Sequence, residues 1–202
     1  MDEGKKDVMF DLKRAVLIYY PPVDFRSGGT LPEKIDTACE LIDFAKAHEK
    51  FYPHLLKWAG SNDPCQVLCQ LPLWIVEVRV DELGEVFQES RQTVLLGGLW
   101  AEMVDDHTAA IGIIKNPMVG RDQFHEIVKQ FGPLVMDYIF RVPGVTRIMA
   151  ACDMENRGAL QLAHKVDLTY YGILKQHIVL GGKPYDYGLF IRVKGDADAD
   201  HK

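Results

Sequence analysis

The segment Asn116-Pro-Met-Val-Gly-Arg-Asp-Gln-Phe-His-Glu126 joins two patterns of different period. Before it, residues 108–115 have the character of a β-strand. After it, apolar residues recur at spacings of three and four, which predicts an amphipathic helix. These apolar residues are Phe124, Ile127, Val128, Phe131, Leu134, Val135 and Tyr138. Residues 141–144 (RVPG) end that helix, so the segment is a strand-to-helix loop.

A loop of this kind is a place where a phosphate group can bind. Small residues let the backbone approach, and amide N–H groups at a helix N-terminus point at the negative charge. Gly120 suits this role, but Asp122 and Phe124 do not. A carboxylate roughly 4 Å from a phosphate costs about 1–4 kcal/mol, and a bulky ring can block the backbone. Arg121 offsets part of the charge. Two interpretations stay open: a phosphate-binding loop, or a structural helix start in which Asp122 complements the helix dipole.

The rest of the chain alternates between strand and helix patterns. Strands are predicted at residues 13–20, 73–80, 93–103, 108–115, 146–152, 170–180 and 185–193. Helices are predicted at residues 32–45, 52–59, 124–138 and 156–166. Residues 104–107 (VDDH) and 181–182 (GG) are short enough to close antiparallel hairpins.

Composition narrows the classes of protein that fit. The chain has 202 residues, 48% of them hydrophobic, which predicts a single domain over residues 1–195 and an acidic tail over residues 196–202. A net charge of −6 argues against nucleic-acid binding. No apolar run reaches the roughly 18–20 residues of a membrane span, so no membrane partner and a cytoplasmic location are expected. Cys65 and Cys69 lack partners at zinc-binding spacings, and no metal is expected.

Five short motifs follow one another between residues 95 and 193. They are Gly97-Gly-Leu-Trp100, Ala110-Ile-Gly-Ile-Ile114, Val145 to Asp153, Glu155-Asn156 through Leu162 and Lys165, and Gly181 to Asp186. In order and spacing they resemble the GNAT superfamily of acyl-CoA-dependent N-acetyltransferases, in particular the branch that acetylates ribosomal-protein N-termini. The resemblance implies an α/β (α+β) fold: a mixed, mostly antiparallel central sheet of about seven strands with helices on both faces.

The resemblance also implies where a cofactor binds. Two central parallel strands, here residues 108–115 and 146–152, splay apart in that family, and acetyl-CoA enters the gap. The positions carried over as cofactor-binding residues are Ile113, Ile114, Gly120, Arg121 and Asn156. Asn156 has a second interpretation, because an asparagine before an apolar-periodic segment is a favoured helix N-cap. Asp153 is interpreted as a cap or loop residue.

Catalysis in such a fold needs a base for the amine and an acid for the leaving thiolate. Glu102 and His107, at the end of a strand and in the turn after it, are candidate bases. Many members of that family have a tyrosine that acts as the general acid at the position where this chain has Ala163. Tyr170 and Tyr171 are the phenols that could replace it, and Tyr171 is the candidate. All four side chains also suit ordinary surface or packing positions.

Two hypotheses about function follow. The first is an N-acetyltransferase that moves the acetyl group of acetyl-CoA directly to a protein or peptide amine. The second is a catalytically inactive GNAT-like subunit of a larger assembly, such as a bacteriophage virion-associated protein, because fold does not fix function. In the second case acetyl-CoA binding has been lost through Asp122 and Phe124, the partners are other subunits, and the location is the host cytoplasm or the virion.

Overall fold

The computed structural model describes residue 12 and residues 15–22, 32–47, 64–79, 93–180 and 182–195. The strands in these ranges are β1 (Ala15–Tyr20), β2 (Leu73–Arg79), β3 (Thr93–Met103), β4 (Thr108–Lys115), β5 (Arg147–Asp153), β6 (Thr169–Leu180) and β7 (Lys183–Val193). The helices are α1 (Pro32–Ala47), α3 (Pro64–Cys69), α4 (Arg121–Phe140) and α5 (Arg157–Lys165).

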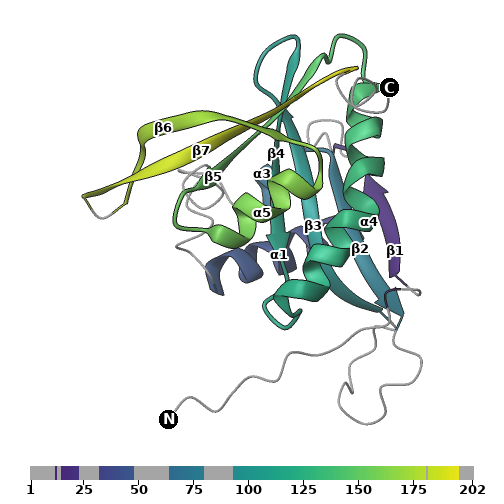
Figure 1. The fold of residues 1–202 in the computed structure, drawn as a ribbon. Helices are drawn as coiled ribbons and strands as arrows, with labels where there is room; N and C mark the ends of the chain where they lie inside the picture. The colour runs from purple at the N-terminus through teal and green to yellow at the C-terminus, as the bar shows by residue number, and fades with distance from the viewer. Residues whose placement is uncertain are drawn as a thin grey trace, which may run out of the picture.

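The strands form one seven-stranded sheet in the order β1-β2-β3-β4-β5-β7-β6. Only the central pair, β4 and β5, is parallel; every other neighbouring pair is antiparallel. Helix α1 packs on one face of the sheet, and α4 and α5 cover the other (Figure 1). The predicted fold, a mixed and mostly antiparallel sheet with helices on both faces, is confirmed.

The predicted strands and helices match the observed ones closely, with two differences. The short helix α3 was not predicted, because six residues give too little periodicity to recognise. Leu134 and Tyr138 were predicted on the buried face of α4, yet they are 57% and 41% exposed, because they lie at the edge of the face that the helix buries through Val135 and Ile139. The helix predicted at 52–59 and the tail at 196–202 lie outside the described residues. A single domain over residues 1–195 stays a prediction.

Two adjacent glycines in β3 bring helices close to both faces of the sheet. A Cβ on Gly97 would lie 2.8 Å from the ring of Phe124 in α4, and a Cβ on Gly98 would lie 2.7 Å from Leu41 in α1. Successive strand residues point to opposite faces, so each glycine makes room for one helix. Phe124 and Leu41 each belong to the buried apolar cluster on their own face of the sheet.

A buried lysine fixes one end of α1. The Lys34 side chain is fully buried, and its ammonium group donates hydrogen bonds to the carbonyl oxygens of Pro21, Cys69 and Leu71. Pro21 follows β1, Cys69 is the last residue of α3, and Leu71 lies between α3 and β2. The lysine therefore ties three segments together through main-chain carbonyl groups. Within the ranges that the structure describes, no helix has the length and apolar character needed to cross a membrane.

Candidate functional site

The central strands β4 and β5 pair for only part of their length. Three residue pairs join them, beginning at Thr108 with Arg147 and ending at Ala110 with Met149. Residues 111–115 and 150–153 then continue without pairing to each other, while β4 stays bonded to β3 and β5 to β7. Main-chain N–H and C=O groups therefore line the sides of an opening in the middle of the sheet.

The loop after β4 is held by its own side chains. Buried Asn116 donates from Nδ2 to the carbonyl of Leu95 at 2.7 Å, and its Oδ1 accepts from the amide of Met118 at 2.8 Å. Lys115 donates to the carbonyls of Asn116 and Val119. These bonds fix the course of the chain up to Gly120, the N-cap of α4. Because this residue is glycine, the helix has no side-chain cap at its N-terminus. The first turn of α4 therefore begins at a fixed place with its amides uncapped by a side chain.

Asp122 and Phe124, the two residues least suited to a phosphate loop, take different places. The Asp122 side chain is 92% exposed, with a carboxylate oxygen 3.5 Å from Nε of Arg121. Phe124 is 4% exposed, and its ring packs against Gly97. Because the Asp122 carboxylate stands in water beside a cation, its repulsion toward a bound phosphate falls to the low end of the range, about 1 kcal/mol.

A second helix start borders the same opening. Asn156 is the N-cap of α5, and its Oδ1 accepts a hydrogen bond from the amide of Ala159 at 3.1 Å. The N-cap interpretation of Asn156 is confirmed. The bond uses only the side-chain oxygen, and the residue also lines the cleft between β4 and β5. That cleft has a volume of about 720 Å³, enough for a ligand of considerable size.

Comparisons with known proteins identify this architecture. No protein-family model and no curated protein matches the sequence. Among solved structures, mutant forms of the spermidine/spermine N-acetyltransferase SpeG from Vibrio cholerae align with 65% of this chain and 72% of that chain, at 16% identity and a TM-score of 0.50. The chain has the GNAT fold.

Two further structures with this fold are similar at lower TM-scores. A GNAT-family acetyltransferase from Bacillus anthracis aligns at 21% identity over 60% of this chain and 65% of that chain, with a TM-score of 0.46. A ribosomal-protein alanine acetyltransferase from Vibrio fischeri aligns at 17% identity over 62% and 63%, also at 0.46. The matched part is less than two thirds of the length of either protein.

Of the residues carried over as cofactor-binding from the GNAT resemblance, Ile113, Arg121 and Asn156 line the cleft. Gly120 is the buried N-cap of α4. Ile114 is fully buried in the apolar cluster against α1, because strand alternation turns it away from Ile113. Ala163, where relatives carry a tyrosine, also lies in the cleft wall.

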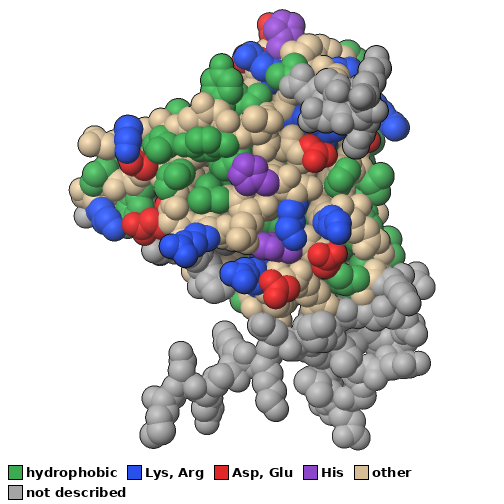
Figure 2. All heavy atoms as spheres, in the orientation of Figure 1, with side chains coloured by type: hydrophobic (Ala, Val, Ile, Leu, Met, Phe, Trp, Pro, Cys, Tyr) green, Lys and Arg blue, Asp and Glu red, His purple; other side chains and the backbone are tan. Residues whose placement is uncertain are grey.

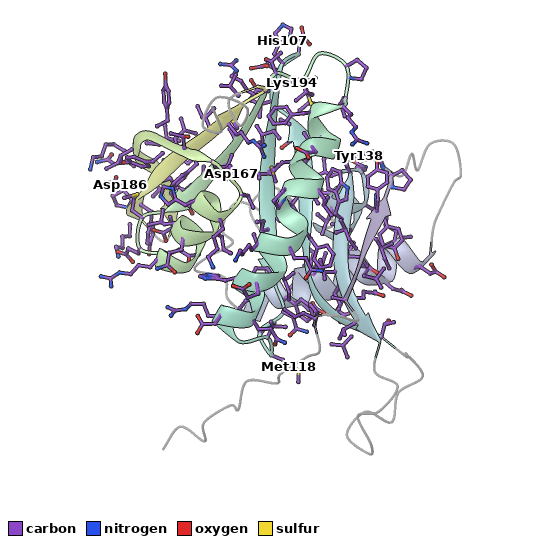
Figure 3. The ribbon with its side chains drawn as sticks, turned by 45° about the vertical axis from the view of Figure 1, so that its right-hand side comes forward. His107, Met118, Tyr138, Asp167, Asp186 and Lys194 are labelled. Atoms are coloured by element: carbon purple, nitrogen blue, oxygen red, sulfur yellow. The ribbon has the colours of Figure 1, made fainter. Side chains whose placement is uncertain are left out.

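The three predicted catalytic residues are not brought together. Glu102 lines the cleft. His107 is exposed in the turn between β3 and β4, with Nδ1 3.1 Å from the carbonyl of Gly144. Figure 3 shows His107 at the opposite end of the sheet from Met118, which belongs to the loop before α4. Tyr171 is 75% exposed on the edge strand β6, outside the cleft lining. Glu102 is therefore the one of the three that the fold places at the opening.

Three residues beside Glu102, to which the sequence gave no role in the site, complete the α1 side of the cleft: Trp100, Asp153 and Tyr187. Trp100 and Glu102 alternate with residues of the other face of β3, and the ring of Trp100 lies over Gly112, whose added Cβ would be 2.0 Å away. Asp153 and Tyr187 are direct partners across β5 and β7 and line the same cleft. Asp153 and Tyr187 meet only through strand pairing, so their shared position was not predictable from sequence spacing.

Burial changes the acid–base properties of these groups. It raises the pKa of the Glu102 carboxyl and raises the pKa of the Cys152 thiol to about 12. The pKa of Tyr187 is raised by burial first and by Asp153 next. Asp153 accepts from the amide of Glu155 through Oδ1, while Oδ2 is buried with no hydrogen-bond partner among the described residues. The cleft thus holds one carboxyl group with a raised pKa, that of Glu102. It also holds the Cys152 thiol and the Tyr187 hydroxyl, which keep their protons at neutral pH.

His125 lies at the other end of the cleft, in the second turn of α4. Its side chain is 6% exposed and lines the cleft. The pKa of the ring is lowered by burial first and then by Lys165 and Arg121, against smaller opposite effects of Asp122 and Glu126. Figure 2 shows Lys, Arg and His side chains on this face, over α5 and the N-terminal half of α4, with Asp and Glu side chains between them. Within the described ranges, no three His, Cys, Asp or Glu side chains are grouped as metal ligands.

Proposed function

We propose that the protein binds acetyl-CoA between β4 and β5 and transfers the acetyl group to an amine. The observation that carries this proposal is the partial pairing of β4 with β5, which leaves main-chain groups of residues 111–115 facing a cleft of about 720 Å³. An extended ligand with amide groups can hydrogen-bond to such an open strand as a further strand would. The pantetheine arm of coenzyme A has that character.

The phosphate end of the cofactor is assigned to the start of α4. A helix N-terminus attracts anions through its amides and its dipole, and the uncapped Gly120 leaves those amides without a side-chain acceptor. Arg121 lines the cleft beside them. Phe124 packs against Gly97 in the core, and the Asp122 carboxylate is exposed. Neither substitution therefore removes the anion site.

The acceptor amine is assigned to the α1 side of the cleft. Glu102 accepts the proton of the attacking amine, since burial raises the pKa of its carboxyl toward the range of a general base. Asp153, with one buried oxygen lacking a described partner, and the face of Trp100 suit a cationic ammonium group before it loses its proton. These residue types favour a positively charged amine as acceptor.

The reaction follows from these positions. The amine nitrogen attacks the thioester carbonyl carbon, the carbon–sulfur bond breaks, and the amine proton goes to Glu102. Ala163 has no proton for the leaving thiolate. The Tyr187 hydroxyl lines the cleft and keeps its proton at neutral pH, because burial and Asp153 raise its pKa. Tyr187 is the donor that we assign.

Calorimetric titration with acetyl-CoA tests the binding step. We expect Arg121→Glu to weaken affinity about tenfold or more, by removing a cation and adding an anion beside the phosphates. The same change favours the α4 dipole, so weaker binding would not reflect a weaker helix. Arg141→Glu, at the opposite end of α4, is the matched control and should bind normally. If the wild type binds no acetyl-CoA at millimolar concentration, the proposal fails and the inactive assembly subunit is the remaining candidate.

A further inference from the structure

Three cationic or protonatable groups meet at the start of α4. Arg121 and His125 lie on its first turns and line the cleft, and Lys165 at the end of α5 is close enough to affect the His125 ring. The chain as a whole has a net charge of −6. The carboxylates of Asp122 and Glu126 also lie near the ring, but neither residue lines the cleft. The wall of the cleft at this place therefore presents Arg121 and no carboxylate, which suits an anion.

The His125 ring has an unused hydrogen-bonding atom. The side chain is 6% exposed, and Nε2 is buried with no hydrogen-bond partner among the described residues. A buried polar atom left without a partner costs about 1–3 kcal/mol. A ligand anion at this wall of the cleft would supply the missing partner if the ring turns to bring Nε2, which is buried in the free protein, to the cleft with a proton on it.

We propose that His125 takes up a proton when a phosphate group binds at the α4 N-terminus, so that affinity for the phosphate ligand falls as pH rises. Where the phosphate ligand is acetyl-CoA, this inference rests on the proposed function. It adds to that function a pH-dependent contact made by a side chain that no motif of the sequence pointed to.

The charges around the ring set the direction of the effect. Burial, Lys165 and Arg121 lower the pKa of His125 in the free protein, and the carboxylates of Asp122 and Glu126 raise it by less. The ring is therefore neutral near pH 7 before binding. A bound phosphate is a nearby anion and raises that pKa. Between the free and the bound value, binding takes up a proton, and affinity changes by at most about tenfold per pH unit.

Calorimetry in pairs of buffers with different ionisation heats measures this proton uptake. The probes are acetyl-CoA and, separately, inorganic pyrophosphate, each titrated between about pH 6 and pH 8. His125→Gln keeps an N–H donor but does not titrate. His164→Gln, which replaces an exposed histidine on α5, is the matched control. The ligand's own titration is common to all three proteins and cancels in the comparison.

We expect the wild type and His164→Gln to take up more protons than His125→Gln and to lose affinity more steeply with pH. Equal proton uptake in all three proteins would overturn the inference while leaving acetyl-CoA binding in place. Proton uptake through His125 with pyrophosphate alone would support it even if acetyl-CoA does not bind, and only the proposed function would then fail. Binding of neither probe would overturn both.

A second measurement does not depend on the variant folding. The pKa of the His125 ring is followed by NMR in the wild type, with and without pyrophosphate. We expect a rise on binding. An unchanged His125 titration in the presence of bound pyrophosphate would overturn the inference.

Discussion

The ring of Phe124 packs directly against Gly97. A Cβ at position 97 would lie 2.8 Å from Cε2 of that ring and 2.5 Å from the carbonyl oxygen of Ile114 in β4. The aromatic residue that looks misplaced in a phosphate loop is thus the core partner of a glycine in β3. Its ring fills the gap between α4 and the sheet, and the residue lines the cleft as well.

Replacing this glycine tests the packing. We expect Gly97→Ala to lower the free energy of unfolding by about 1–3 kcal/mol, the usual effect of overpacking, because one of the two close contacts is with rigid backbone. Urea denaturation measures the change. Gly172→Ala in β6 is the control, since an added Cβ there meets nothing within 4 Å. Equal stability of the two variants would contradict the Gly97–Phe124 relationship.

Sequence periodicity was enough to predict most of the strands and helices, because alternation and helical spacing are local properties. Their assembly into one mixed sheet with helices on both faces was predicted from the resemblance to the GNAT superfamily. The relation of Phe124 to Gly97 was not predictable in this way, since it depends on how α4 lies across β3. The same holds for Asp153 and Tyr187, which meet only through the pairing of β5 with β7. The place of His125 in the cleft was not predictable for another reason: a single histidine on a helix forms no recognisable spacing with other functional residues.

Where local chemistry decides, the sequence was informative. Asn156 precedes an apolar-periodic segment and is the N-cap of α5. Glu102 ends a strand and lies at the cleft. His107 is only five residues farther along, but it lies exposed in the turn between β3 and β4 and outside the cleft lining. Nearness in sequence therefore did not place both residues at the cleft.

Because Lys34 is buried, the free energy of unfolding depends on pH in the alkaline range. The pKa of this lysine is lowered from 10.5 to about 8 by burial. Between these values the unfolded chain binds more protons than the folded protein, so the free energy of unfolding rises with pH across this window. The rise is on the order of 3 kcal/mol. Chemical denaturation at several pH values measures it.

Lys34→Met should remove that rise, whereas Lys46→Met on the same helix should keep it, because the Lys46 side chain is 60% exposed. The difference between the two variants separates Lys34 from other groups that titrate in alkali. Parallel pH profiles of the two variants would show that Lys34 is not the source.

Glu102 should control the acid limb of the pH–rate profile. The carboxylate form is the base, and burial raises its pKa, so the rate of acetyl transfer should rise with pH through that raised value. Glu102→Gln should lower kcat by about 10²–10⁴-fold with little change in the Kd of acetyl-CoA. A polyamine or peptide amine serves as acceptor in the assay. His107→Gln is the control, and an equal loss in both variants would argue against Glu102 as base.

Cys152 should not carry the acetyl group. With a pKa of about 12, its thiol stays protonated at neutral pH and is a poor nucleophile. Incubation with acetyl-CoA in the absence of an amine should therefore add no acetyl group to this residue, as intact-mass and peptide analysis would show. Cys152→Ala should keep its transferase activity. An acetylated Cys152 that forms and decays at the rate of turnover would overturn direct transfer.

Asn156 has two roles that different substitutions separate. Asn156→Ala removes the bond from Oδ1 to the amide of Ala159 and should lower the free energy of unfolding by about 1 kcal/mol. Asn156→Ser keeps a capping oxygen and should keep most of that stability. If the amide N–H₂ group also contacts the cofactor, as its place in the cleft favours, both variants should bind acetyl-CoA more weakly. Normal affinity in the serine variant would reduce Asn156 to a helix cap, because only the cap survives that change.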